Sequence, residues 1–206
     1  MTKKPKYWLT AKKYLSNKDK IMEKLIKSYK SPSEVILTSR KDVFFSLCKS
    51  IIGQQISVAA ADSIWLRLSN HIGEMTPENV LKKTQESIAS CGVTRPKASY
   101  IYGLAEQSDH LLNQPYDDMT DNEIMNHLTS FRGIGPWTAE MMLMFHFLRP
   151  DVFSIGDIGL VRAVEKLVPN AASRDDILDI SKRWKPYRTA ASWYLWRTVD
   201  PEPVEY

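Results

Sequence analysis

Apolar side chains recur every three or four positions along most of the chain, the spacing of an amphipathic α-helix. The first clear case contains Val43, Phe44, Leu47, Ile51 and Ile52. A polar break, QQIS, follows, and the rhythm resumes in VAAADSIWLRL. No stretch alternates apolar and polar residues persistently, and the Asn-Gly and Asp-Gly signals of β-hairpins are absent. The pattern predicts an all-α protein of about nine to eleven short helices.

Capping residues indicate where several of these helices begin. Thr120 and Glu123 have the spacing of a capping box, in which each side chain binds the other residue's backbone N–H. Other signals place helix starts at Thr76 with Pro77, at Pro96 in PKASYIYGLAEQ, and at Ser173 or Arg174. A final helix is expected from about Tyr187 to Trp196.

The length of 206 residues suits one large domain or two small ones, and 43% hydrophobic residues are enough for a real core. No stretch approaches the roughly 18 uninterrupted apolar residues of a membrane span. The start, MTKKPKYWLTAKKYL, is positively charged but has no apolar run after it, unlike a secretory signal. We therefore expect an intracellular protein that does not contact a membrane.

The net charge of +4 is small but unevenly distributed. Residues 1–30 contain ten lysines against only Asp19 and Glu23. This start is either a solvated, partly disordered tail or an electrostatic contact with an anionic polymer, and the sequence leaves both open. The small total argues against a protein that coats nucleic acid and permits one that grips it locally.

The cysteines and histidines exclude several kinds of metal site. Cys48 and Cys91 are too few for a disulfide framework, a four-thiolate zinc site or a four-cysteine iron–sulfur cluster, so we expect reduced thiols. None of the four histidines has convincing metal-ligand spacing to another ligand.

The segment FRGIGPWTAE, residues 131–140, joins two predicted helices through a very short link. Gly133 and Gly135 permit a sharp turn and leave no side chain between the backbone and an approaching molecule. Backbone amides at the start of the next helix, near Pro136, could bind an anion such as a DNA phosphate. Ile134 should point inward. Taken alone, an ordinary helix-turn-helix corner without a ligand is the simpler interpretation.

The wider pattern resembles the helix-hairpin-helix of the DNA glycosylase superfamily. It comprises LTSFRGIGPWTA at 128–139 and VFSIGD, which ends at Asp157. Three more segments resemble the 3-methyladenine DNA glycosylase II (alkylation repair) branch: IIGQQISVAAA at 51–61, GVTRPKASYIYGLA at 92–105 and WKPYRTAASWYLWR at 184–197. The four segments stand in the family's order. Larger members carry an additional N-terminal β-rich domain, and this chain looks like the compact form.

The resemblance implies that Asp157 is the catalytic carboxylate. Its position before an amphipathic helix also suits an N-cap, and the two roles are compatible. Breaking a base–sugar bond builds positive charge on the sugar, which a carboxylate can stabilise while it orients or deprotonates water. Three other aspartates lack the motif spacing and are expected to face solvent or cap helices: Asp151, Asp175 and Asp176.

Trp137 stands where the lyase branches of the family place a lysine nucleophile. No amine is available there for a Schiff base, which favours a monofunctional hydrolase. The family places pocket aromatics at the positions of Trp137 and Trp196, and Met141 falls where some members have tyrosine. An indole face attracts a cationic alkylated base. The alternative for any tryptophan is the core, which we prefer for Trp65, Trp184 and Trp193.

The resemblance also implies DNA contacts and one candidate ion. The family inserts a side chain from the QQIS turn into the gap left by a flipped base, and matching places Gln55 there, although a polar corner is nearly as good an explanation. The expected DNA contacts are Gly133, Ile134, Gly135, Thr138 and Gln55. A monovalent cation could bind the backbone carbonyls of Thr129, Phe131 and Ile134. No other cofactor and no iron–sulfur cluster are expected.

Together these features predict an all-α protein of two helical subdomains with an active-site cleft between them. One subdomain is 41–150 and the other combines 1–40 with 151–206. The expected function is a monofunctional DNA N-glycosylase that starts base excision repair by flipping out and hydrolysing alkylated purines, 3-methyladenine foremost. It would act as a monomer on double-stranded chromosomal DNA.

Three alternatives remain: a non-enzymatic helix-hairpin-helix DNA-binding protein, a bifunctional lyase, which Trp137 disfavours, and a helical protein unrelated to nucleic acid. The last alternative leaves the joint occurrence of GIG, QQIS and Asp157 unexplained.

Overall fold

The computed structural model describes residues 5–29, 42–169 and 171–199. These ranges contain thirteen α-helices, a π-helical turn and a 3-10 turn, and no β-strand. The all-α prediction is confirmed, whereas the count of about nine to eleven helices is too low. Helices α6 and α8, which have six and five residues, had no start among the sequence signals. A helix of that length spans little more than one 3.6-residue turn, so its apolar residues hardly repeat.

The described residues form two units, which we name by their candidate residues. The hairpin unit comprises residues 42–142, and the aspartate unit comprises 5–29 with 143–169 and 171–199. The division falls before the expected boundary at 150. Phe145 and Leu148 pack against the core of the aspartate unit, and the Arg149 carbonyl accepts hydrogen bonds from Tyr7 and Thr189 of that unit.

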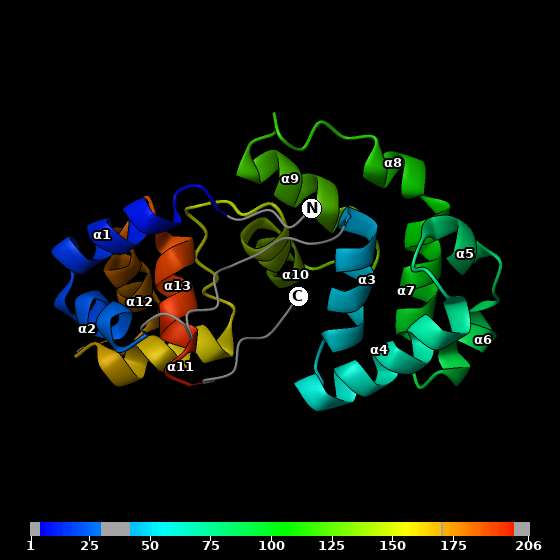
Figure 1. Cartoon of the computed structure of the whole chain (residues 1–206), viewed down its shortest axis with the longest axis horizontal. Coiled ribbons are helices and arrows are strands. Elements are labelled where there is room, and N and C mark those ends of the chain that lie inside the picture. Colours follow the sequence, from blue (N-terminus) through cyan, green and yellow to red (C-terminus); the bar gives the residue numbers. More distant parts are fainter. Residues whose placement is uncertain (1–4, 30–41, 170, 200–206) are drawn as a thin grey trace. The chain divides into compact units, whose positions relative to one another are not determined.

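The hairpin unit contains α3 to α10 (Figure 1). Their bounds are α3 Val43–Gly53, α4 Val58–Ile72, α5 Pro77–Leu81, α6 Gln85–Ser90, α7 Arg95–Glu106, α8 Ser108–Leu112, α9 Asp121–Thr129 and α10 Pro136–Met141. Helices α3 and α7 contact each other, and Phe44 and Leu47 of α3 and Ile101 of α7 are fully buried. The predicted start of α5 and the capping box of α9 are confirmed. Helix α10 continues into the π-helical turn Met142–His146.

The aspartate unit contains α1 Trp8–Lys18, α2 Lys20–Ser28, α11 Ile158–Leu167, α12 Arg174–Ser181, the 3-10 turn Lys182–Trp184 and α13 Arg188–Trp196 (Figure 1). The sequence predicted that α12 starts at Ser173 or Arg174. Ser173 is the N-cap and forms a capping box, and Arg174 is the first helical residue. The tryptophans Trp184 and Trp193 lie in the core, as predicted. In the hairpin unit, Trp65 is only partly buried and meets the edge of Phe45, so the core prediction does not hold fully there.

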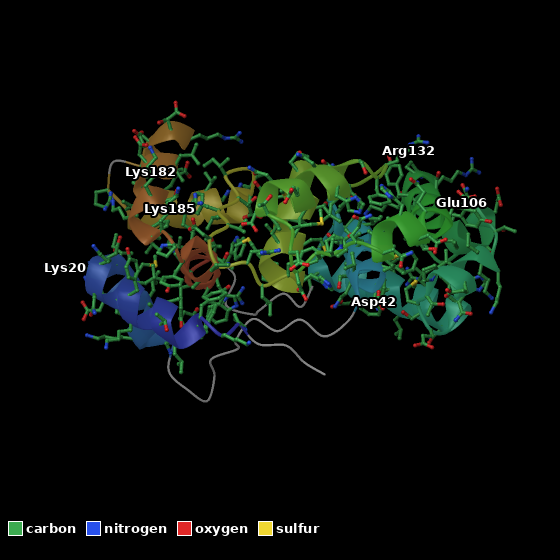
Figure 2. The ribbon with its side chains drawn as sticks, turned by 90° about the horizontal axis from the view of Figure 1, so that it is seen from above. Lys20, Asp42, Glu106, Arg132, Lys182 and Lys185 are labelled. Carbon is green, nitrogen blue, oxygen red and sulfur yellow. The ribbon has the colours of Figure 1, made fainter. Side chains whose placement is uncertain are left out.

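Most of the lysine-rich start is helical, so the interpretation as a partly disordered tail is wrong for residues 8–28. Trp8 packs edge-on against Trp193 with ring centroids 5.5 Å apart. The Asp19 carboxylate caps α2 and accepts a hydrogen bond from Trp184 Nε1 at 3.0 Å. Of the described lysines in this segment, Lys12 is half-buried and the others are exposed, among them Lys20 (Figure 2). Residues 1–4 and 30 lie outside the described residues.

None of the helices in the described ranges is long and apolar enough to cross a membrane.

A cluster of aromatic rings lies where α8 and α9 approach the hairpin. The His127 ring lies 4.8 Å from His110, 5.2 Å from Phe131 and 5.8 Å from Tyr116, centroid to centroid. Its Nε2 atom is buried without a hydrogen-bond partner among the described residues. Burial lowers the pKa of His127, and the neighbouring His110 adds to the shift. The cluster therefore favours neutral His127.

This shift predicts a hairpin unit that loses stability in acid. Unfolded His127 titrates near the ordinary pKa of about 6.5 and folded His127 below it, so between these values the unfolded chain binds more protons. The free energy of unfolding should therefore fall as the pH drops through about 6.5 towards the folded pKa. Urea unfolding at a series of pH values measures this. His127→Gln should reduce the slope in that window, and an identical slope in both proteins would contradict the assignment.

Candidate functional site

Asp157 lies at the N-cap of α11, as predicted. Its Oδ1 atom accepts one hydrogen bond from the Leu160 backbone N–H at 2.6 Å and another from Trp196 Nε1 at 2.8 Å. The residue is half-buried. Two donors on one oxygen fix the orientation of the carboxylate before any ligand arrives, which is the condition for an electrostatic role in catalysis.

Trp196 supports this carboxylate and is itself supported from one face. Its ring stacks on Phe145 with centroids 5.7 Å apart and planes 28° apart. A Cβ atom on Gly159 would lie 3.2 Å from Asp157 Oδ1 and 3.6 Å from Trp196 Cδ1, so glycine leaves room for both side chains. The structure therefore brings the predicted catalytic residue and one predicted pocket aromatic into direct contact. Phe145 was not predicted from the sequence.

The other three aspartates behave differently. Asp151 was predicted to face solvent or cap a helix, but its carboxylate forms a bidentate ion pair with Arg188, Nε to Oδ1 at 2.7 Å and Nη2 to Oδ2 at 2.9 Å. A bidentate pair of this kind fixes the position of the carboxylate. Asp176 completes the capping box of α12 and Asp175 is exposed, both as predicted.

The hairpin, residues 130–135, joins the end of α9 to the start of α10. Gly133 has φ of +89°, and a Cβ there would come within 2.4 Å of the Tyr100 ring. Ile134 points inward, as predicted, with 4% of its surface exposed. Gly135 has φ of −89°, and a Cβ there would meet nothing within 4 Å. The two glycines therefore serve different needs: close packing at Gly133 and an open backbone at Gly135.

Thr138, predicted to contact DNA, lies inside the hairpin unit. Only 2% of its surface is exposed, and its Oγ1 accepts a hydrogen bond from Gln54 Nε2 at 3.1 Å. The same nitrogen donates to the Gly133 carbonyl at 3.1 Å. The Thr138 side chain therefore links the hairpin to the turn after α3. Its partner in this hydrogen bond is Gln54, which we did not single out from the sequence.

Gln55, the predicted insertion residue, lies in the turn between α3 and α4. Its side chain is exposed and its φ is +59°. Ser57 ends the turn by capping α4 through the Ala60 N–H at 3.3 Å. Gln55 thus projects from the surface of a short turn, as an inserting residue must.

The two remaining pocket candidates lie on α10. Trp137, in its first turn, is partly exposed. Met141, at its last position, is 2% exposed. A side chain buried to this degree offers almost no surface to a base, so Trp137 is the better placed of the two.

The predicted ion site uses backbone atoms only. The Phe131 carbonyl accepts the Ile134 N–H at 3.1 Å, and a carbonyl oxygen has a second lone pair that a cation could use. Among the described residues, no group of three or more histidine, cysteine or acidic side chains could hold a metal. Cys48 and Cys91 are free and buried, and burial raises the pKa of the Cys48 thiol.

Known proteins are similar to this chain in both sequence and fold. Residues 48–186 match the HhH-GPD superfamily of base excision DNA repair proteins. A DNA-3-methyladenine glycosylase of Bacillus subtilis is 31% identical over 174 residues, 77% of this chain and 57% of that protein. The chain thus spans less than two thirds of that relative's length.

Two solved structures match almost end to end. The 3-methyladenine DNA glycosylase Mag1 of Schizosaccharomyces pombe, in complex with abasic DNA, gives a TM-score of 0.80 at 27% identity over 92% of this chain and 96% of that one. A DNA-3-methyladenine glycosidase from Bacillus halodurans gives 0.79 at 30% identity over 97% and 93%. The resemblance seen in four sequence segments is confirmed, and the chain belongs to the HhH-GPD superfamily of base excision DNA repair proteins.

Proposed function

We propose that the protein is a monofunctional DNA N-glycosylase that removes alkylated purines, 3-methyladenine foremost, from double-stranded DNA. It acts as a monomer on chromosomal DNA and starts base excision repair. The observation that carries the proposal is the Asp157 carboxylate, held by Leu160 N–H and Trp196 Nε1 in a chain of this superfamily. The 3-methyladenine glycosylases among its relatives support the substrate class.

The held carboxylate suits cleavage of an N-glycosidic bond. As the bond breaks, its electron pair leaves with the base and the sugar gains positive charge, which Asp157 stabilises. Water then bonds to the sugar carbon and loses a proton, for which the carboxylate is the acceptor. A purine alkylated at a ring nitrogen already carries positive charge and leaves easily. One carboxylate can therefore suffice without a strong acid to protonate the base.

Trp137 supports both the hydrolytic outcome and the substrate class. It replaces the lysine that a lyase needs, so the product is an intact strand with an abasic site. An indole face attracts a cationic base by about 0.5 to 2 kcal/mol, depending on how far water is excluded. A base can reach such a face only after it is flipped out of the duplex.

The hairpin and the Gln54–Ser57 turn are the proposed DNA contacts. The open backbone at Gly135 can approach a phosphate closely, and Gln55 can fill the gap left by a flipped base. A monovalent cation on the carbonyls of Thr129, Phe131 and Ile134 would add positive charge beside that phosphate. The reaction itself requires no cofactor.

A base-release assay tests the function directly. Duplex DNA methylated at purines is incubated with the protein, and free bases are separated from the polymer by chromatography. We expect free 3-methyladenine and DNA that breaks only after alkali. Tight DNA binding without base release from any lesion would instead identify a non-enzymatic binding protein. Strand breaks without alkali would contradict the monofunctional mechanism.

A further inference from the structure

The backbone of the turn after α3 is held in a disfavoured conformation. Gln55 has φ of +59°, in the left-handed region that side chains with a Cβ rarely adopt. Its own side chain is exposed and contributes little packing. Such a conformation persists when the surroundings impose it. Lys97 and Gln54 make four hydrogen bonds around this turn.

Lys97, on α7, holds the start of the turn. Its Nζ donates to the carbonyls of Ile52 at 2.8 Å and Gln54 at 2.7 Å. Carbonyls at the end of a helix have no partner within it, and a cation there is favoured by the helix dipole. Burial lowers the pKa of Lys97, which is the cost of placing the ammonium group at this junction. Lys97 therefore holds the carbonyls on either side of Gly53.

Gln54 extends the same connection to the hairpin. Its amide nitrogen donates to the Gly133 carbonyl and to Thr138 Oγ1, both at 3.1 Å. An amide NH₂ has two hydrogens, and both are used. The turn that carries Gln55 is thereby joined to the loop that carries Gly133 and to the first turns of α10.

Tyr100 completes the arrangement from α7. It follows Lys97 by three positions and so lies on the same face of the helix. Its ring occupies the space that a Cβ on Gly133 would need, and the Arg132 guanidinium lies over it at 5.7 Å from the ring centroid. Arg132 itself reaches the surface of the hairpin unit (Figure 2). One face of α7 thus holds both loops.

We propose that Lys97 and Gln54 are positioning residues that, with Tyr100, hold Gln55 at a fixed separation from the hairpin. The inference rests on the proposed function, because the separation between Gln55 and the hairpin matters only in a protein that opens a base pair of bound DNA. A duplex bound at the hairpin then meets Gln55 at the base pair to be opened. The cost of ordering the turn is met during folding, so binding energy remains available for displacing the base.

Base release from two duplexes tests the proposal. In one, a methylated purine is paired; in the other, the same lesion lies opposite an abasic site, where little displacement is needed. Lys97→Met should slow release from the paired duplex by about 10- to 100-fold. On the second duplex it should act within about threefold of the wild type, because the unpaired base is cheap to extrude. A 2-aminopurine beside the lesion should show a smaller fluorescence rise on binding to the paired duplex.

Two more variants separate positioning from a general loss of charge or structure. Lys82→Met removes one positive charge from the same unit, where the exposed Lys82 Nζ donates to Asn79 Oδ1, and should leave both rates unchanged. Gln54→Leu removes the hydrogen bonds to the Gly133 carbonyl and Thr138 Oγ1. Like Lys97→Met, it should slow base release from the paired duplex much more than from the duplex with the abasic site. The two losses should be less than additive in the double variant, because both act on one turn.

Equal slowing of both duplexes by Lys97→Met, or fully additive losses, would overturn the positioning role. Absence of base release by the wild type would instead overturn the proposed function, so the two failures are distinguishable.

Discussion

Asp157→Asn should reduce release of methylated bases by about 10² to 10⁴-fold, the usual range for a positioned carboxylate in proton transfer or charge stabilisation. The amide oxygen of asparagine can still accept the hydrogen bonds from Leu160 N–H and Trp196 Nε1, so the fold should persist. What is lost is the negative charge beside the developing cation. Single-turnover kinetics measures the chemical step apart from product release.

The controls for this variant are thermal unfolding and DNA affinity. Both should stay close to the wild type, because the N-cap geometry is preserved. Asp175→Asn is the matched change: it also neutralises a carboxylate at the start of a helix in the same unit, here an exposed one, and it should leave base release unchanged. Undiminished release by Asp157→Asn would remove Asp157 from the catalytic role.

Gly133→Ala should destabilise the hairpin unit by about 1 to 3 kcal/mol or more, since it combines an unfavourable backbone angle with a collision. Its φ is +89°, and the new Cβ would lie 2.4 Å from two carbon atoms of the Tyr100 ring. The ring cannot easily move away, because it is joined to the rigid helix α7. Urea unfolding measures the loss.

Gly135→Ala is the matched control in the same loop. Its φ of −89° suits alanine and its Cβ would meet no atom within 4 Å, so stability should hardly change. DNA affinity should nevertheless fall, because the methyl group would stand between the backbone and a phosphate. Equal destabilisation by both substitutions would contradict the division of roles between the two glycines.

Local signals predicted the elements of this fold well. Thr120 with Glu123, and Asp157 before α11, cap helices by contacts within three residues, so their roles depend on nearby sequence alone. The partner of Asp151 was missed for the opposite reason. Arg188 lies 37 positions away, and only the packing of the unit brings the two together.

The candidate site shows the same limit. The family motif named Asp157 and Trp196 separately, but they are 39 positions apart, and their hydrogen bond depends on how α11 and α13 pack. The resemblance implied a DNA contact at Thr138, yet the residue is buried. Lys97 lay inside a recognised segment, but a lysine near a helix start gives no sign that it binds the end of another helix.

The buried thiols have a consequence for survival of the protein under chemical stress. Methylating agents attack cysteine as the thiolate, at a rate that depends on exposure and on the fraction deprotonated. Cys48 has no exposed surface, and the raised pKa of its thiol keeps that fraction very small. Cys91 is also buried. The two thiols of the folded chain are therefore poor targets for the reagents that create its proposed substrates.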